Sequence, residues 1–183
     1  MDFPTLSTSR LRLDKLTNDD ALALLAIFGD EKVVEYYDAE VYQSEEQALT
    51  LIEFFNGRFT ANAGIRWAIR LKETDTLIGT CGFHSISASM KSAGIGYELA
   101  FEQWGKGYAM EALKQVITFA YCDASFFNGL YRIQADTMDG NLASEALLKK
   151  LGFKEEGIRR GAGFWKGGFH DLKCFGLLKS DLY

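Results

Sequence analysis

The chain has 183 residues, of which 48% are apolar, and a formal net charge of -5. This length fits one domain over residues 1–183, and the apolar content is sufficient for a buried core. The acidic balance argues against a nucleic acid or a membrane surface as partner, since both favour basic patches, and it would suit a cationic substrate.

Three widely spaced cysteines without a CxxC motif, Cys81, Cys122 and Cys174, predict reduced, mostly buried thiols in a cytoplasmic protein. The first residues lack the basic and apolar regions of a signal peptide. No apolar run approaches the roughly 20 residues that a membrane span needs. We therefore expect neither a leader nor a membrane anchor.

The first third of the chain predicts one strand and three helices. Residues 10–13 alternate polar and apolar side chains as a half-buried strand does. Polar residues at 17–20 are N-cap candidates, and Ser44 with Gln47 three residues later forms a capping box. The expected helices span about 20–28, 32–37 and 44–61.

From Ile65 the apolar residues repeat every two positions. Residues 67–71 and 77–83 predict the strands of an antiparallel hairpin around a turn at 73–76. A further strand is expected at 94–100. These strands form an antiparallel meander that ends directly before a glycine-rich segment.

Residues 103–112 carry most of the functional information. They place Gly105, Gly107 and the small Ala109 just before an apolar stripe of helical period. A bend with few side chains that opens into a helix leaves backbone N–H groups unpaired at the positive end of the helix dipole, where phosphates bind. We therefore expect an anionic ligand at this bend.

The rest of the chain completes a mixed sheet. A strand at 131–135 makes the helix after the bend the crossover of a βαβ unit, whose two strands normally lie parallel. Asn141 begins another helix, which Gly152 and Phe153 end. Final strands are expected near 154–160 and 164–178. This order predicts an α+β fold with a mixed, mostly antiparallel sheet and flanking helices.

Several glycine-rich motifs compete for the bend. No Walker A string GxxxxGK[ST] occurs in the chain. A dinucleotide fingerprint would need a small residue where Met110 stands, and it would open a repeated βαβ array. A plain glycine turn that joins strand to helix stays open on these residues alone.

Neighbouring motifs favour another family. Residues 104–109 resemble the acyl-CoA-binding signature [Q/R]xxGx[G/A] of the GNAT superfamily of N-acetyltransferases, with Trp104 where Gln or Arg is usual. Residues 141–153 resemble that superfamily's later motif NxxAxxxYxKxGF. The chain also resembles the branch of this superfamily that acetylates the N-termini of ribosomal proteins. This resemblance rests on an aromatic residue followed by GKGYA and an acidic residue, and on residues 8–13 and 168–171. The resemblance spans almost the whole chain and implies a single-domain GNAT fold with a splayed sheet.

The resemblance implies acetyl-CoA as the donor and coenzyme A as a product. Backbone amides in the bend would bind the pyrophosphate, and Lys106 would add charge attraction. The pantetheine arm would pair with the strand before the bend, and Asn141 would contact this arm besides capping its helix. The residues implied at the cofactor site are Leu99, Ala100, Trp104, Gly105, Lys106, Gly107, Tyr108, Ala109 and Asn141.

Acetyl transfer to an amine requires a neutral nucleophile, donors for the oxyanion and a proton for the departing thiolate. Relatives often supply that proton from the tyrosine of the later motif, where this chain has Leu148. Ser144 is our candidate for the acid, although it is also an ordinary helix-start residue. Glu98 is the candidate general base, although strand alternation places it opposite Tyr97. Water relay without a dedicated base is the alternative.

The remaining polar residues do not predict a second catalytic site or a metal site. His170 beside Asp171 has no nucleophile elbow, and no HxxxH or CxxC metal spacing exists. We expect this pair to order a turn between the last strands, and we expect no metal. Trp165 and Phe169 either line an acceptor pocket or pack in the core.

The expected reaction is direct attack of a primary amine on acetyl-CoA in a ternary complex. A protein N-terminal α-amine is the closest analogy for the acceptor, while polyamines, amino acids and amine antibiotics stay open. A non-catalytic acyl-CoA-binding protein and a nicotinamide oxidoreductase are the alternatives from other classes. The resemblance also suggests a homodimer.

Overall fold

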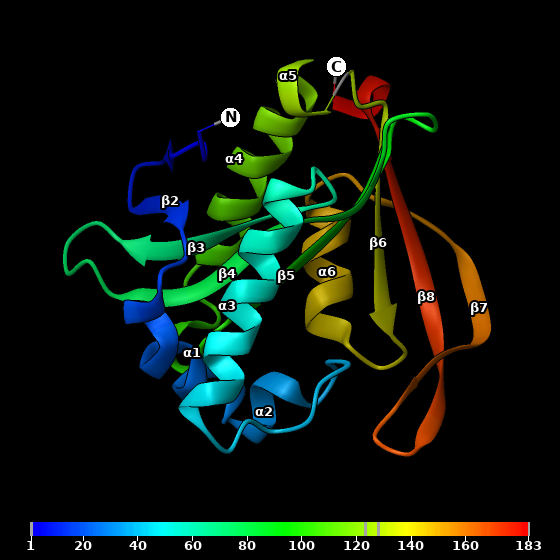
Figure 1. Cartoon of the computed structure of the whole chain (residues 1–183). Coiled ribbons are helices and arrows are strands. Elements are labelled where there is room, and N and C mark those ends of the chain that lie inside the picture. Colours follow the sequence, from blue (N-terminus) through cyan, green and yellow to red (C-terminus); the bar gives the residue numbers. More distant parts are fainter. Residues whose placement is uncertain (1, 123, 128, 183) are drawn as a thin grey trace.

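The structure is a computed structural model that describes residues 2–122, 124–127 and 129–182. Its centre is a single mixed sheet in the order β1-β2-β3-β4-β5-β6-β8-β7 (Figure 1). The strands are β1 Leu6–Ser7, β2 Leu11–Lys15, β3 Ile65–Leu71, β4 Leu77–Ser87, β5 Ser92–Leu99, β6 Arg132–Met138, β7 Lys154–Trp165 and β8 Gly168–Leu178. The helices are α1 Ala21–Phe28, α2 Glu31–Val34, α3 Glu45–Thr60, α4 Tyr108–Cys122, α5 Ala124–Phe127 and α6 Leu142–Lys150.

The sheet is covered on both faces, and each face has its own core. Successive side chains of a strand point to opposite faces, and β3 illustrates this alternation. Trp67 and Ile69 belong to the core that contains α4 and α6, whereas Ala68 between them belongs to the core that contains α1 and α3. In Figure 1, α3 accordingly lies in front of the sheet and α4 behind it. No helix in the described part of the chain is long and apolar enough to cross a membrane.

The sheet opens between its two central strands. Strands β5 and β6 are the parallel pair, and their pairing covers only Ser92–Arg132, Ala93–Ile133 and Gly94–Gln134. The two strands then diverge, which leaves the β6-facing edge of β5 without a strand partner from Ile95 onward. This confirms the predicted βαβ unit, with α4 as its crossover, and the predicted splayed sheet.

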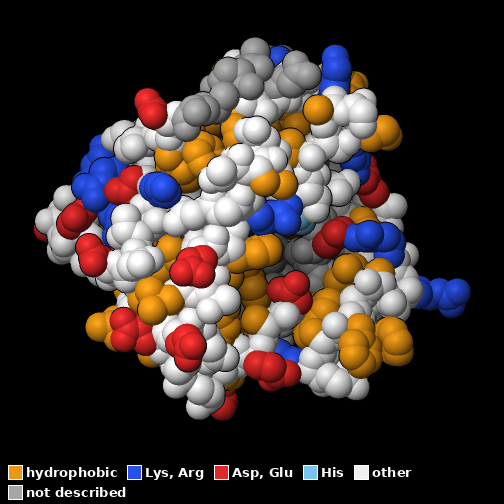
Figure 2. Space-filling model, viewed as in Figure 1, with side chains coloured by type: hydrophobic (Ala, Val, Ile, Leu, Met, Phe, Trp, Pro, Cys, Tyr) orange, Lys and Arg blue, Asp and Glu red, His pale blue; other side chains and the backbone are white. Residues whose placement is uncertain are grey.

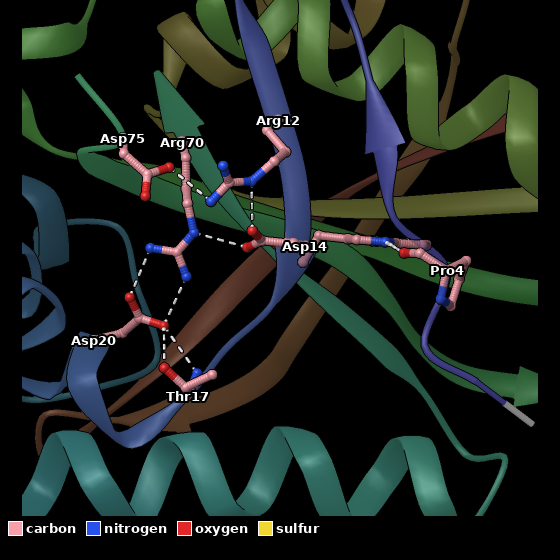
Figure 3. A network of polar contacts seen from close by, with 8 residues as sticks. Pro4, Arg12, Asp14, Thr17, Asp20, Arg70 and Asp75 are labelled. Carbon is pink, nitrogen blue, oxygen red and sulfur yellow. Dashed lines mark hydrogen bonds and ion pairs between the residues drawn. The ribbon is translucent and has the colours of Figure 1, made fainter. Parts of the chain in front are cut away.

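An ion-pair network anchors the first helix to the sheet (Figure 3). Arg70 of β3 places Nε 2.8 Å from Asp14 Oδ1 and Nη1 2.7 Å from Asp20 Oδ1. The backbone N–H of Thr17 donates to Asp20 Oδ2 at 2.8 Å. Burial would raise the pKa of the Asp20 carboxyl, but the hydrogen bonds from Arg70 and Thr17 hold it below its usual range. The start of α1 is therefore fixed relative to β2 and β3.

The last hairpin differs from the prediction. The turn falls at residues 166–167 and not at 161–163, because the glycines that indicated a loop lie at β-bulges, where the register between β7 and β8 shifts. Gly161 has φ +58°, a left-handed conformation that glycine adopts without strain. His170 and Asp171 lie on β8, within the strand expected at 164–178, and His170 orders the adjoining turn as predicted, since its Nε2 lies 3.0 Å from Trp165 O. The His170 ring stacks on Trp165 with centroids 4.4 Å apart, and Asp171 Oδ1 accepts from Gly161 N–H at 2.7 Å.

Candidate active site

The glycine-rich bend lies between β5 and α4. Gly105 and Gly107 have φ of +74° and +81°, in the left-handed region that costs other residues strain. A Cβ on Gly107 would also lie 3.4 Å from Arg10 Nη2. Both glycines are therefore required by the backbone path of the bend.

The bend presents a row of unpaired amide donors. Within the described residues, none of the backbone N–H groups of residues 105–110 donates a hydrogen bond, and the first paired one is Glu111 N–H, which donates to Gly107 O at 3.1 Å. These donors lie at the positive end of α4, a helix of 15 residues. Such an arrangement fits the negatively charged oxygens of a pyrophosphate.

Glu111 fastens this bend to the N-terminal segment. Its Oε1 accepts from Thr8 Oγ1 at 2.5 Å, Ser9 Oγ at 3.0 Å and Arg10 N–H at 2.9 Å, and its Oε2 accepts from Arg10 Nε at 2.7 Å. Partial burial opposes ionisation, but these hydrogen bonds lower the pKa of Glu111 to about 2. Two motifs about a hundred residues apart, at residues 8–13 and 104–111, are thus parts of one structure.

Arg10 also touches the bend directly. Its guanidinium lies 4.5 Å from the centroid of the Tyr108 ring, and its Nη1 donates to Lys106 O at 3.1 Å. The contacts hold the carbonyl side of the bend, so the amide side stays free for a ligand.

A cavity of about 640 Å³ adjoins the bend. It lies between the end of β5, the start of α4, the start of α6 and the segment around α2. Seven of the nine predicted cofactor residues line it: Leu99, Trp104, Gly105, Gly107, Tyr108, Ala109 and Asn141. Among the described residues, Ala100 and Lys106 do not line it. We call this space the coenzyme cavity.

Two of the lining residues have a visible structural role. The indole Nε1 of Trp104 donates to Leu99 O at 2.9 Å, which ties the bend to the end of β5. The side chain of Asn141 accepts from Ser144 N–H at 3.2 Å, which confirms the predicted N-cap of α6. A contact of Asn141 with a pantetheine arm stays a prediction.

Ser144 has a partner that the sequence did not reveal. Its hydroxyl lies 2.6 Å from the hydroxyl of Tyr97, and both residues line the coenzyme cavity. Burial raises the pKa of Tyr97 to about 12, so that its hydroxyl carries a proton at neutral pH. Leu148, which stands where relatives often have tyrosine, is buried in the core.

Glu98 also lines the coenzyme cavity, but it is buried and fully engaged. Thr80 Oγ1 donates to its Oε1, and Arg66 Nη2 donates to its Oε2. Tyr37 Oη donates to the same Oε2 at 3.3 Å. Burial would lower the pKa of Arg66, yet the charge of Glu98 keeps it above its usual range, so the guanidinium stays charged. Sequence periodicity placed Glu98 on its strand but gave no sign of these partners.

A second cavity of about 530 Å³ lies on the other side of this buried pair. It is bounded by α3, the segment after α2, strands β3 to β6 and the β7–β8 hairpin. Tyr36 and Tyr37 line both cavities, so the two spaces meet at these side chains. Trp165 lines the second cavity, which was one of its two expected roles. Phe169 has neither expected role, because it is 76% exposed and packs on Phe164 at the surface.

No metal centre is evident in the described part of the chain, where no three His, Cys, Asp or Glu side chains gather as metal ligands would. The coenzyme cavity also has no cysteine among its described lining residues. The polar groups that line this cavity include the hydroxyls of Tyr97 and Ser144 and the carboxylate of Glu98.

Comparison with known proteins identifies the family. A model of the acetyltransferase (GNAT) domain matches residues 10–154, which include the bend, the coenzyme cavity and the opening of the sheet. The uncharacterized N-acetyltransferase YoaA of Bacillus subtilis (strain 168) is 37% identical over 177 residues, covering 97% of this chain and 98% of that protein.

Solved structures agree with this assignment. The crystal structure of a probable acetyltransferase superposes with a TM-score of 0.84 at 27% identity and covers 97% of this chain and 98% of that one. RimL, a ribosomal L7/L12 alpha-N-protein acetyltransferase solved in complex with coenzyme A, superposes with a TM-score of 0.81 at 19% identity, covering 96% and 98%. The second likeness concerns the fold alone. The chain belongs to the GNAT family, and it is an N-acetyltransferase that uses acetyl-CoA.

Proposed function

We propose that this enzyme acetylates the N-terminal α-amine of a protein, such as a ribosomal protein. The observation that carries the proposal is the meeting of two cavities at Tyr37, one beside the amide-rich bend and one open to an acceptor. RimL, which shares the fold, is described as acting on a ribosomal protein's α-amine, and this supports the choice of acceptor.

The donor would bind along the bend and β5. The free amides of residues 105–110 would hold the pyrophosphate, with Lys106 nearby as a cation. The unpaired edge of β5 from Ile95 to the Leu99 N–H would offer backbone groups to the pantetheine arm, with Asn141 on the opposite wall. Ala100 would contribute no backbone hydrogen bond, because its N–H donates to Ile78 O and its carbonyl accepts from Gln103 N–H. This arrangement would point the thioester toward Ser144 and Tyr37.

The leaving group needs a proton. The amine nitrogen forms a bond to the acetyl carbon, the carbon–sulfur bond breaks, and the sulfur leaves as a thiolate. In our proposal Ser144 Oγ gives its proton to this sulfur and is reprotonated from Tyr97 Oη, 2.6 Å away. Solvent then restores the proton of the pair.

The amine must lose a proton in the same reaction. We propose that Tyr37 Oη accepts this proton while its own moves to Glu98 Oε2, 3.3 Å away, and that Glu98 returns the proton to solvent through Tyr37 after the product leaves. Glu98 would thus act through Tyr37, because its oxygens already accept from Arg66 and Thr80. Only the deprotonated, neutral form of the amine can attack the thioester. For an α-amine, a substantial fraction is in this form near pH 8.

A mass-spectrometric acetylation screen tests the function. Purified protein and acetyl-CoA are incubated with N-terminal peptides of ribosomal proteins, spermidine, free amino acids and aminoglycosides. We expect a peptide to gain one acetyl group on its α-amine, with stoichiometric free coenzyme A. Binding of acetyl-CoA without turnover of any amine would favour an acyl-CoA sensor, and thermal protection by NAD alone would favour an oxidoreductase.

The resemblance further supports a cytoplasmic homodimer built from one domain per chain. Light scattering measures the mass in solution, and we expect about twice the 20.5 kDa of a single chain. A mass of one chain at micromolar concentration would contradict the dimer and would leave the catalytic proposal unaffected.

A further inference from the structure

The second cavity has a wall of aromatic rings. They come from α3, from β4, from the segment between α2 and α3 and from the β7–β8 hairpin: Tyr36, Tyr42, Phe54, Phe55, Phe83 and Trp165. Figure 2 shows this face of the molecule hollowed beside α3, with hydrophobic side chains around the hollow and charges of both signs at its rim. Aromatic walls favour flat or bulky apolar groups over extended polyamines.

Most charges in this cavity are already compensated. Arg66 pairs with Glu98, and Asp136 accepts from Arg159 Nη2. Burial, together with the nearby arginines, lowers the pKa of His84, so its ring is neutral at pH 7. These groups therefore do not offer a free charge to a ligand.

Two lining charges differ from the rest. Across the described residues, no carboxylate pairs with Arg58 of α3, whose Nη2 donates to Ala63 O at 2.7 Å, and no cation pairs with Asp38. Both side chains line the second cavity, as does His84. Asp38 directly follows Tyr37, the residue at the junction with the coenzyme cavity.

We propose that the second cavity binds an α-amino acid unit with a large apolar side chain. Its amine lies toward Asp38 and Tyr37, its carbonyl or carboxylate oxygen toward Arg58, and its side chain among the aromatic rings. The proposal rests on the proposed function, since it assigns the acceptor of the same reaction. The unit is either a free amino acid or the first residue of a peptide.

A set of matched amines tests this acceptor class. Phenylalanine and a peptide that begins with phenylalanine carry the ring and the oxygen, phenethylamine lacks the oxygen, and a matched peptide that begins with serine lacks the ring. We expect kcat/KM for the better of the two complete acceptors to exceed that of phenethylamine and of the serine peptide by about tenfold or more, the usual effect of one charge-assisted hydrogen bond or one buried ring. Whichever of phenylalanine and the phenylalanine peptide reacts better shows whether the unit is a free amino acid or the first residue of a peptide.

This set of acceptors distinguishes a wrong acceptor class from a wrong enzymatic function. If the serine peptide, phenethylamine or spermidine reacts as well as or better than both phenylalanine acceptors, the enzyme acetylates amines but the acceptor class is wrong. If no peptide in either set is acetylated on its α-amine, the proposed function itself fails, whether or not a small amine reacts.

Variants of Arg58 assign the oxygen contact. Arg58→Met should raise KM for the phenylalanine acceptor about tenfold and leave KM for phenethylamine unchanged, whereas Arg58→Lys should restore most of the loss. Arg58 also bonds Ala63 O at the end of α3, and damage to that helix would affect both amines equally. Equal effects on both amines, or no effect on either, would overturn the assignment.

Discussion

The hydroxyl oxygens of Tyr97 and Ser144 lie 2.6 Å apart on the wall of the coenzyme cavity. Tyr97 comes from β5 and Ser144 from the first turn of α6, so the pair spans the opening of the sheet. Relatives often place a tyrosine at the position of Leu148, whose side chain here is buried in the core. The phenol that contacts Ser144 thus comes from β5 and not from the helix that carries Leu148.

Removal of the serine hydroxyl should slow acetyl transfer. We expect Ser144→Ala to lower kcat about a hundredfold, the usual contribution of general acid catalysis, with little change in the Kd of coenzyme A. Tyr97→Phe should lower kcat less, and the double variant should be no slower than Ser144→Ala, because the two groups act as one. Steady-state kinetics and calorimetry measure both quantities.

Ser89→Ala, on the exposed β4–β5 turn, is the matched control and should keep full activity. Unchanged kcat in Ser144→Ala would remove the serine from the mechanism. Additive losses in the double variant would show that the two hydroxyls act independently.

The backbone of the bend should control coenzyme binding. Gly107→Ala forces a side chain into φ +81° and toward Arg10 Nη2, so we expect the Kd of coenzyme A to rise about tenfold or more. Gly129→Ala is the matched control, because Gly129 has a similar φ of +77°, has open space around it and lies outside the coenzyme cavity. This variant should lower the stability of the protein without affecting the Kd of coenzyme A. An equal Kd for both variants would refute the role of the bend.

Glu111 should stabilise the enzyme in a pH-dependent way. Its pKa in the folded protein, about 2, lies below the ordinary value of 4.5, so its contribution is present above about pH 4.5 and is lost as the pH falls toward 2. We expect Glu111→Gln to lower the free energy of unfolding by about 2 kcal/mol at pH 7 and by progressively less in acid. Urea titrations at several pH values test this, and a pH-independent difference would contradict it.

Tyr37 and Glu98 should be separable by experiment. Tyr37→Phe should lower kcat about tenfold and leave the melting temperature nearly unchanged, because it removes one long hydrogen bond while Glu98 keeps those from Arg66 and Thr80. Glu98→Gln should destabilise the fold by about 3–5 kcal/mol, since it leaves Arg66 buried without a counter-charge. Adding Arg66→Met to Glu98→Gln should recover stability but not activity. Wild-type kcat in Tyr37→Phe would exclude the relay.

Local patterns in the sequence predicted much of the fold. Three predicted features were confirmed: the alternation around Trp67, the capping box at Ser44 and the N-cap at Asn141. Each of them depends only on residues a few positions away. The β7–β8 hairpin was less predictable, because a glycine in a bulge and a glycine in a loop have the same local signal.

Long-range partners decide the rest of the site. Glu111 bonds with Thr8 and Arg10 across about a hundred residues of sequence. Glu98 bonds with Arg66 and Tyr37, which are also tens of residues away. The local periodicity of the sequence carries no information about such distant partners. The second cavity is likewise lined by segments spread from Phe28 to Leu172, and its charges become informative only once their partners are known.

The central claim is that an amine meets acetyl-CoA between the two cavities. Its most direct test measures free coenzyme A and acetylated amine together, as amine-terminated peptides are titrated at fixed acetyl-CoA. We predict equal amounts of both products, saturation with the amine and no acetylated enzyme on the pathway. Release of coenzyme A independent of any amine, or none at all, would contradict the account.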